Sequence, residues 1–334
     1  MVYFFFIPLI YLINMFFEKK GYLVNNTGQS HQTFSEKKRV PLTGGIFILI
    51  FFTFYFSNEL VFVFSLIILF IIGILTDLDF IKSPTKRFVI QILYLASFII
   101  FFDLKISDLR NDYLNFLLSN FYFNLFFVLF CFLVLVNGSN FIDGNNGLSI
   151  GYYLIIFTIL ILLINNNVVN YDYDLVINFT IFLVILFFFN LFNFFYLGDN
   201  GIYLISIFAG YVLIDLINQN INISPYFIAV LLWYPCFELL FSMIRKFKYK
   251  LSPMEPDINH LHQLLFKSLN IKFSFPINYN NSLTGLIINT YNLIILFLSS
   301  LKPFSTNFQI GLIFINIVTY LIAYLIFKKI SRVN

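Results

Sequence analysis

The sequence predicts an all-α, polytopic membrane protein in which residues 1–334 form one integral membrane domain. Of its residues 60% are hydrophobic and only 11% are charged, and the mean hydropathy is +0.88. A soluble domain of this composition would lack the polar surface that water requires. Long apolar runs recur along the whole chain, and a helix of about 20 such residues crosses a bilayer. Composition and pattern therefore both exclude a soluble protein.

Eleven apolar segments qualify as predicted spans. They are residues 2–17, 43–57, 59–76, 88–102, 121–137, 148–164, 174–195, 201–217, 225–244, 282–300 and 308–327. The first has no basic stretch ahead of it and no small-residue cleavage site, and Lys19 and Lys20 follow it directly. We therefore expect a retained helix with its N-terminus outside, and not a signal peptide.

The distribution of basic residues predicts the orientation. Eleven spans place loops 18–42, 77–87, 138–147, 196–200 and 245–281 on one side, together with the C-terminal tail. These segments hold 17 of the 20 Lys and Arg, whereas the opposite loops hold Lys105, Arg110 and Lys302. The positive-inside rule makes the basic side cytoplasmic.

Five short polar segments interrupt the apolar chain, and all lie at the predicted cytoplasmic side. They read PLTGG (41–45), TDLD (76–79), NGSNFIDGNNGL (137–148), LGDNG (197–201) and NHLH (259–262). Acids, amides and histidines are costly beside lipid and mark functional positions in membrane proteins.

Asp199 lies between Gly198 and Gly201, where a tight turn lets backbone approach a ligand closely. A carboxylate in such a turn can hold Mg²⁺, which proteins bind through one or two carboxylates plus substrate phosphates. A simple helix N-cap is the alternative, because Asp caps helices well.

Asp143 lies in a segment rich in turn formers and side-chain amides. An ordinary turn would explain its Gly and Asn residues. It does not require Asn137, Asn140 and Asp143 at intervals of three, a spacing that places them on one face if the helix continues through them.

His260 and His262 lie in the most basic loop, downstream of Arg245. As zinc ligands they are weak candidates, because no third His or Cys is near. They suit contact with a phosphate better, and Arg245 is a candidate for the same role. The loop's basic residues are also explained by the positive-inside signal alone.

Two further segments supply candidate substrate-binding groups. Gly44 and Gly45 open a span, where free backbone N–H groups can face an anion, although Pro41 at a helix entry is routine. Asp77 follows a span, and Lys86 and Arg87 come just before the next one. Together the segments predict a divalent metal that holds a pyrophosphate.

These motifs, in this order, resemble the polyprenyl-phosphate N-acetylhexosamine-1-phosphate transferases over almost the whole chain. Pro41-x-x-Gly44-Gly45 resembles the family's glycine pair, and residues 137–148 resemble N-x-x-N-x-x-D-G-x-D-G-L. Residues 197–201 resemble L-G-D-x-G, whose aspartate is a Mg²⁺ ligand in the family. Residues 252–262 resemble its cytoplasmic histidine loop.

The resemblance implies an all-helical enzyme of ten or eleven spans in the inner membrane. It would use Mg²⁺, or Mn²⁺, to transfer a sugar phosphate from a UDP-N-acetylhexosamine to undecaprenyl phosphate, with a cytoplasmic active site. Asp77, Asp143 and Asp199 would be the catalytic acids, with Asp199 and Asp77 on the metal. Asn137, Asn140, Lys86, Arg87 and the groups named above would bind substrate. A second copy of the chain is an allowed partner, and nucleic acid is not expected.

The histidine loop is closer to the branch that starts O-antigen and lipopolysaccharide synthesis than to the peptidoglycan branch. Three positions depart from the family pattern: Thr76 replaces an acid, Asn146 replaces the second aspartate of its loop, and Gln263 replaces a further histidine. The lipid phosphate is already mostly dianionic at pH 7, so we expect Thr76 to be compatible with activity.

Two other classes of protein share parts of this pattern. An intramembrane aspartyl protease requires G-x-G-D, but Tyr196 stands at the first glycine. A membrane scaffold or transporter that has lost catalysis is the stronger alternative, because three site positions depart from the family. Transporters show internal repeats and broken helices at mid-membrane, and the sequence shows neither.

Overall fold

The computed structural model describes residues 5–24, 40–250, 252 and 259–331; within these ranges it is helical apart from turns and one isolated β-bridge, Val24–Pro41. The all-α class is thus confirmed. Most of the predicted loop 18–42, namely residues 25–39, and part of loop 245–281 lie outside the described residues. The helices are α1 (Phe6–Lys20), α2 (Gly44–Tyr55), α3 (Leu60–Asp77), α4 (Pro84–Phe101), α5 (Asp112–Leu118), α6 (Phe121–Ile142), α7 (Leu148–Asn165), α8 (Tyr173–Leu191), α9 (Gly198–Gln219), α10 (Pro225–Leu231), α11 (Trp233–Lys248), α12 (Leu261–Lys272), α13 (Ile277–Ser300) and α14 (Thr306–Ile330).

The helices confirm a polytopic membrane protein. In the described part of the chain eight helices are long and apolar enough to span a bilayer, or nine if α10 and α11 form one bent span. Helices α1 and α2 match predicted spans but have 15 and 12 residues. The predicted total of eleven and the orientation therefore stay predictions. Two short helices, α5 and α12, were not predicted.

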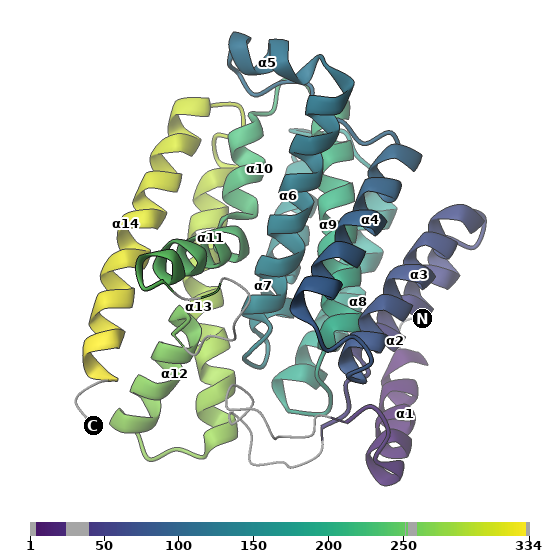
Figure 1. Ribbon diagram of the computed structural model, residues 1–334, viewed down its shortest axis with the longest axis vertical. Coiled ribbons are helices and arrows are strands. Elements are labelled where there is room, and N and C mark those ends of the chain that lie inside the picture. Colours follow the sequence, from purple (N-terminus) through teal and green to yellow (C-terminus); the bar gives the residue numbers. More distant parts are fainter. Residues whose placement is uncertain (1–4, 25–39, 251, 253–258, 332–334) are drawn as a thin grey trace.

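Helix α9 is the central helix of the bundle, and most of its side chains are buried. It packs against α2, α3 and α6 (Figure 1). Glycines permit the closest approaches: a Cβ at Gly73 of α3 would lie 2.3 Å from Asn200 Cα, and one at Gly45 of α2 would lie 2.6 Å from Asn200 C. Small residues at such crossings are typical of membrane helices. They bring three helix ends together.

The predicted span 225–244 is broken. Helix α11 turns by 76° from α10, so α10 runs along the bundle whereas α11 lies across it (Figure 1). Pro235 lacks an N–H and leaves the carbonyl of Leu231 without its helical partner. The Tyr152 hydroxyl donates to that carbonyl at 2.7 Å and accepts from Tyr234 N–H at 3.3 Å. One tyrosine thus satisfies both backbone groups at the break.

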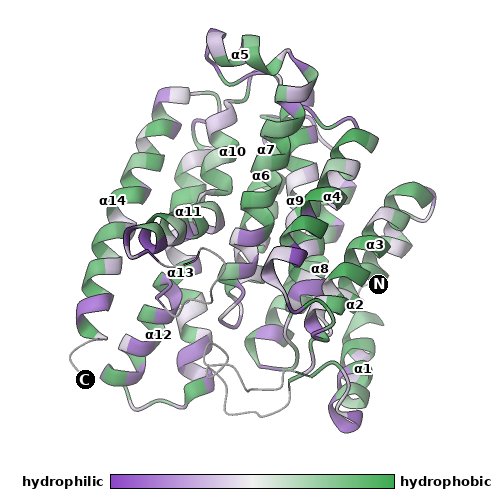
Figure 2. Ribbon diagram, in the orientation of Figure 1, coloured by the Kyte–Doolittle hydropathy of each residue, from purple (hydrophilic) through white to green (hydrophobic). Residues whose placement is uncertain are grey.

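Hydrophobic residues dominate the length of the bundle, and hydrophilic ones gather toward its lower end as drawn (Figure 2). Helices α3 and α6 end there, and α9 begins there (Figure 1). The polar segments found in the sequence are therefore brought to one end of the molecule.

Candidate active site

Asp77, the last residue of α3, binds the first turn of α9. Its Oδ1 accepts from Asp199 N–H at 2.8 Å, and its Oδ2 accepts from Asn200 N–H at 3.0 Å and from the Asn200 amide. These N–H groups lie in the first turn of a helix, where no intrahelical acceptor exists. Asp77 therefore caps α9 from another helix, and its negative charge lies at the positive end of the helix dipole. Its predicted role as a metal ligand stays a prediction.

Asp199 lies in the first turn of α9 and is held by three side chains. Its Oδ1 accepts from Asn140 Nδ2 at 2.6 Å. Its Oδ2 accepts from Arg87 at 3.0 Å and from the Tyr203 hydroxyl, one turn further along α9, at 3.0 Å. The side chains of Arg87 and Asp199 are 33% and 16% exposed, so this ion pair is reachable from solvent. A positive group already lies beside the carboxylate predicted to bind a cation.

Asp143 follows α6 directly and is half-buried. Its Oδ1 accepts from the Ser149 hydroxyl of α7, and its Oδ2 has no hydrogen-bond partner among the residues that the structure describes. Burial raises the pKa of Asp143 well above the ordinary value, and the nearby charges of Asp199 and Asp77 raise it further. Like charges and low dielectric both disfavour the ionised form. The three acids thus lie within electrostatic reach of one another.

The two asparagines at the end of α6 have separate partners. Asn140 contacts Asp199, whereas Asn137 donates to Gln91 Oε1 of α4 at 3.1 Å. The first contact therefore joins α6 to α9 and the second joins α6 to α4. Helix α6 continues through Asn137 and Asn140 but ends at Ile142, so Asp143 is its C-cap residue and not part of the predicted helical face. Of the two asparagines, Asn140 is the one with a hydrogen bond to a carboxylate.

The predicted glycine and lysine groups have no hydrogen bond to the carboxylates among the described residues. Gly44 N–H donates to the Tyr196 carbonyl at 3.2 Å, and Gly44 and Gly45 are buried against α9. Their backbone is engaged in packing α2 on α9. The Lys86 side chain is exposed at the start of α4.

Arg245 anchors the histidine loop. Its guanidinium donates to the Asn259 carbonyl, to the Tyr324 hydroxyl at 2.9 Å and to Ser242 at 3.3 Å. The side chain is buried. The structure therefore uses this predicted substrate-binding residue to fix the backbone just before His260.

His260 and His262 stack with ring centroids 5.6 Å apart. His262 is fully buried, and neither of its ring nitrogens has a hydrogen-bond partner among the described residues. Burial lowers the pKa of His262 to about 3, so its ring is neutral at pH 7. A Cβ at Gly144 would lie 2.9 Å from His262 Nε2, so only glycine leaves room for this ring beside Asp143.

The three departures from the family pattern have local partners. The Thr76 hydroxyl donates to the Ile72 carbonyl of its own helix at 3.0 Å. Gln263 Oε1 accepts from His260 N–H at 3.2 Å and so caps α12. Asn146 Nδ2 donates to Asn193 Oδ1 at 2.7 Å. Each of the three side chains therefore makes a hydrogen bond that stabilises the fold, at a position where the family has an acid or a histidine.

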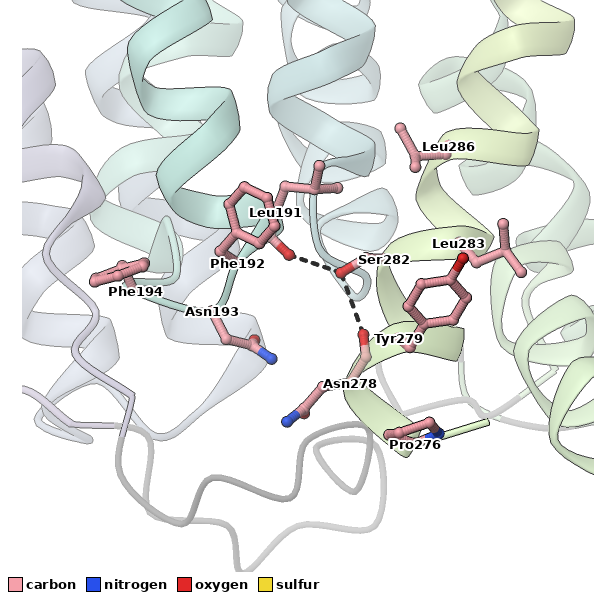
Figure 3. A pocket seen from close by; sticks show the side chains of 10 residues that line it. All are labelled: Leu191, Phe192, Asn193, Phe194, Pro276, Asn278, Tyr279, Ser282, Leu283 and Leu286. Atoms are coloured by element: carbon pink, nitrogen blue, oxygen red, sulfur yellow. Dashed lines mark hydrogen bonds between the residues drawn. The ribbon is translucent and has the colours of Figure 1, made fainter. Parts of the chain in front are cut away.

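A cavity of about 510 Å³ lies where α8 ends and α13 begins. Apolar side chains such as Leu191 and Leu286 line it, together with Asn193, Asn278 and Ser282; the Ser282 hydroxyl donates to the carbonyls of Leu191 and Asn278 (Figure 3). Its lining has no acid and no cation. It is therefore separate from the carboxylates, and Asn146 contacts its wall through Asn193.

The acids provide oxygen ligands for a hard divalent cation, but too few to surround it completely. Among the described residues no group of three or more His, Cys, Asp and Glu side chains could hold a metal by itself. Mg²⁺ rarely needs such a cage, because it is held by one or two carboxylates together with substrate phosphates. The open Oδ2 of Asp143 and the carboxylate of Asp199, shared with Arg87, provide oxygen donors of that kind.

Several groups of the site were missed by sequence reasoning. Tyr203 lies four residues after Asp199 on one helix face, a spacing that would have identified it. Ser149 and Gln91 are ordinary residues of apolar helices, and nothing in their local sequence marks them. Glu238 contacts His260 from a distant helix, and its place in an apolar segment did not identify that partner.

Comparison with known families supports the resemblance found in the sequence. Residues 59–217 match the model of Glycosyl transferase family 4, a range that contains Asp77, Asn140, Asp143 and Asp199. No curated protein matches the chain. The match supports the glycosyl transferase family 4 superfamily, which implies polyprenyl-phosphate sugar-phosphate transferase activity in general and a membrane enzyme with a lipid substrate.

Proposed function

We propose that the protein transfers N-acetylhexosamine-1-phosphate from a UDP-sugar to undecaprenyl phosphate. The products are a polyprenyl-diphosphate sugar and UMP, and the reaction starts synthesis of a cell-surface polysaccharide of the O-antigen type. The enzyme would lie in the inner membrane with its site facing the cytoplasm. The observation that carries the proposal is the meeting of Asp77, Asn140 and Asp199 at one end of the bundle, with Arg87 beside them and Asp143 within electrostatic reach.

Each residue has a role that follows from its contacts. Asp77 holds the first turn of α9, so that the Asp199 carboxylate faces Asn140 and Arg87. Asp199 and Asp143 would hold Mg²⁺, or Mn²⁺, which supplies charge neutralisation for the diphosphate. Arg87 is free to pair with a phosphate when a metal takes its place on Asp199, because guanidinium binds phosphate and carboxylate alike.

Phosphoryl transfer depends mainly on positioning and charge stabilisation. The lipid phosphate is mostly dianionic at pH 7 and needs little help from a base. A site with Thr76 in place of an acid is therefore consistent with this reaction.

The test is UMP release by the detergent-purified full chain with undecaprenyl phosphate, Mg²⁺ and a panel of UDP-N-acetylhexosamines. We expect release that requires the lipid and the metal and that is abolished in Asp199→Asn and in Asp143→Asn. Asp79→Asn is the matched control, since Asp79 is an exposed acid two residues after Asp77. Release that persists in both Asn variants, or no release with any sugar from folded wild-type protein, would contradict the proposal and favour a scaffold or transporter.

A further inference from the structure

Glu238 is a fully buried acid on α11 that points to the histidine loop. Its Oε1 accepts from His260 Nδ1 at 2.9 Å and from Leu261 N–H at 3.3 Å, and its Oε2 accepts from the Tyr320 hydroxyl at 2.8 Å. A buried carboxylate is costly unless it is paired and hydrogen-bonded. Here every partner comes from α12, its N-cap residue or α14, so the acid ties the histidine loop to the bundle.

The break between α10 and α11 makes this contact possible. Because α11 lies across the bundle (Figure 1), it carries Glu238 sideways to the start of α12. A straight continuation of α10 would follow the direction of the other spans. The bend between α10 and α11 thus determines which part of the site Glu238 can reach.

Two aromatic neighbours, in addition to Glu238, fix the ring of His260. Phe141 contacts it edge to face with centroids 4.9 Å apart, and His262 stacks on it at 5.6 Å. Phe141 is the neighbour of Asn140, which binds Asp199. His260 therefore lies against the same helix end that carries the carboxylate site.

The bond to Glu238 determines which nitrogen of His260 is left for a ligand. An ionised carboxylate only accepts hydrogen bonds, so Nδ1 of His260 must carry a proton. Nε2 is then the nitrogen without a protein partner among the described residues. In histidines of this kind the bond at one nitrogen sets the role of the other.

We propose that Glu238 is a positioning residue that holds His260 with Nε2 directed to a diphosphate oxygen of the nucleotide sugar. The inference rests on the proposed function. It places the diphosphate of the UDP-sugar beside the histidine half of the site, by which we mean His260 and His262 with Glu238 and Arg245. A phosphate oxygen accepts, so the bound ring carries a proton on both nitrogens, and Glu238 stabilises the resulting positive charge from the far side.

The kinetic test is a double-mutant cycle on the full chain. Glu238→Gln keeps size but removes the negative charge that stabilises a doubly protonated ring. Its amide can donate to Nδ1, which leaves a neutral ring with its proton on Nε2. We expect kcat/KM for the UDP-sugar to fall about 10-fold or more, as for other carboxylates that orient a histidine. Glu238→Gln added to His260→Gln should cost nothing further. Tyr320→Phe is the matched control, because it removes the other bond to the same carboxylate and leaves the His260 contact intact.

A second readout does not depend on activity. The chain has three histidines, His31, His260 and His262, so ¹⁵N-histidine NMR of detergent-purified protein resolves them, with His260→Gln giving the assignment. We expect His260 to carry its proton on Nδ1 in the wild type and in Tyr320→Phe, and to change tautomer in Glu238→Gln.

The outcomes separate the two proposals. A wild-type chain that releases no UMP overturns the proposed function, and the substrate role of Nε2 with it. An active wild type whose Glu238→Gln variant keeps the His260 tautomer, or in which the two substitutions lower kcat/KM multiplicatively, overturns the positioning role alone.

Discussion

The two halves of the candidate site are built in different ways. In the carboxylate half, helix ends meet directly, and the oxygens of Asp77 and Asp199 are occupied by N–H and hydroxyl groups of α4, α6 and α9. In the histidine half, a loop is held by two buried charged side chains, Arg245 and Glu238, and the nitrogens of His262 have no partner in the described part of the chain.

The two halves should therefore respond to different kinds of substitution. The carboxylate half rests on close helix crossings at glycine, so steric change should be most damaging there. The histidine half rests on individual hydrogen bonds within a buried space, so its properties should respond more to charge and pH.

The largest effect is expected from Gly73→Ala. The new Cβ would lie 2.3 Å from Asn200 Cα, so α3 must move away from α9. Overpacking costs about 1–3 kcal/mol even where side chains can yield, and backbone yields less. We expect loss of most monodisperse protein and a lower Tm in detergent. Gly311→Ala is the control, because no atom of the described residues lies within 4 Å of a Cβ there; equal behaviour of the two variants would refute the close crossing.

Asp77→Asn should lower both stability and UMP release. It removes the charge at the start of α9 and one acceptor for its N–H groups, a loss of about 1–2 kcal/mol for a helix cap. We expect a lower Tm and no recovery of activity at high Mg²⁺. Unchanged Tm together with rescue by added Mg²⁺ would show that Asp77 is a direct metal ligand instead of a cap.

His262 should make the protein sensitive to acid. Its pKa is about 3 in the fold against an ordinary 6.5, so the unfolded chain binds a proton that the folded chain excludes. Its contribution to stability is complete above pH 6.5 and falls as the pH drops toward 3. Between pH 7 and pH 5 the loss is about 2 kcal/mol.

The check is thermal unfolding of wild type and His262→Asn at both pH values. The variant cannot take up this proton and should lose less stability on acidification. The same pH dependence in both proteins would mean that His262 is not buried as a neutral ring.

The smallest effect is expected from Thr76→Asp. Within the described residues the Thr76 hydroxyl bonds its own helix alone, and the lipid phosphate needs little help from a base. We expect kcat to change little and the pH–rate profile to stay near that of the wild type. A gain beyond about 100-fold, the lower end of what a general base contributes, would show that the missing acid matters.

Short-range features of this chain could be predicted well. Apolar runs identified every long helix, because the free energy of placing a segment in lipid depends on its own composition. Asp199, Asp143 and His260 were found because polar residues stand out against such runs. The separate partners of Asn137 and Asn140 were not foreseen, since both lie on one face and only packing decides what that face meets.

The sequence by itself determined the helical membrane class and the positions at which chemistry is concentrated, because hydropathy and polar spacing are local properties of the chain. The tertiary structure alone decided that Asp77 caps α9, that Tyr152 stabilises the bend before α11, and that Glu238 reaches His260. Each of these contacts joins residues 22 to 122 positions apart. Their existence depends on how the helices cross, and the composition of neither partner specifies that geometry.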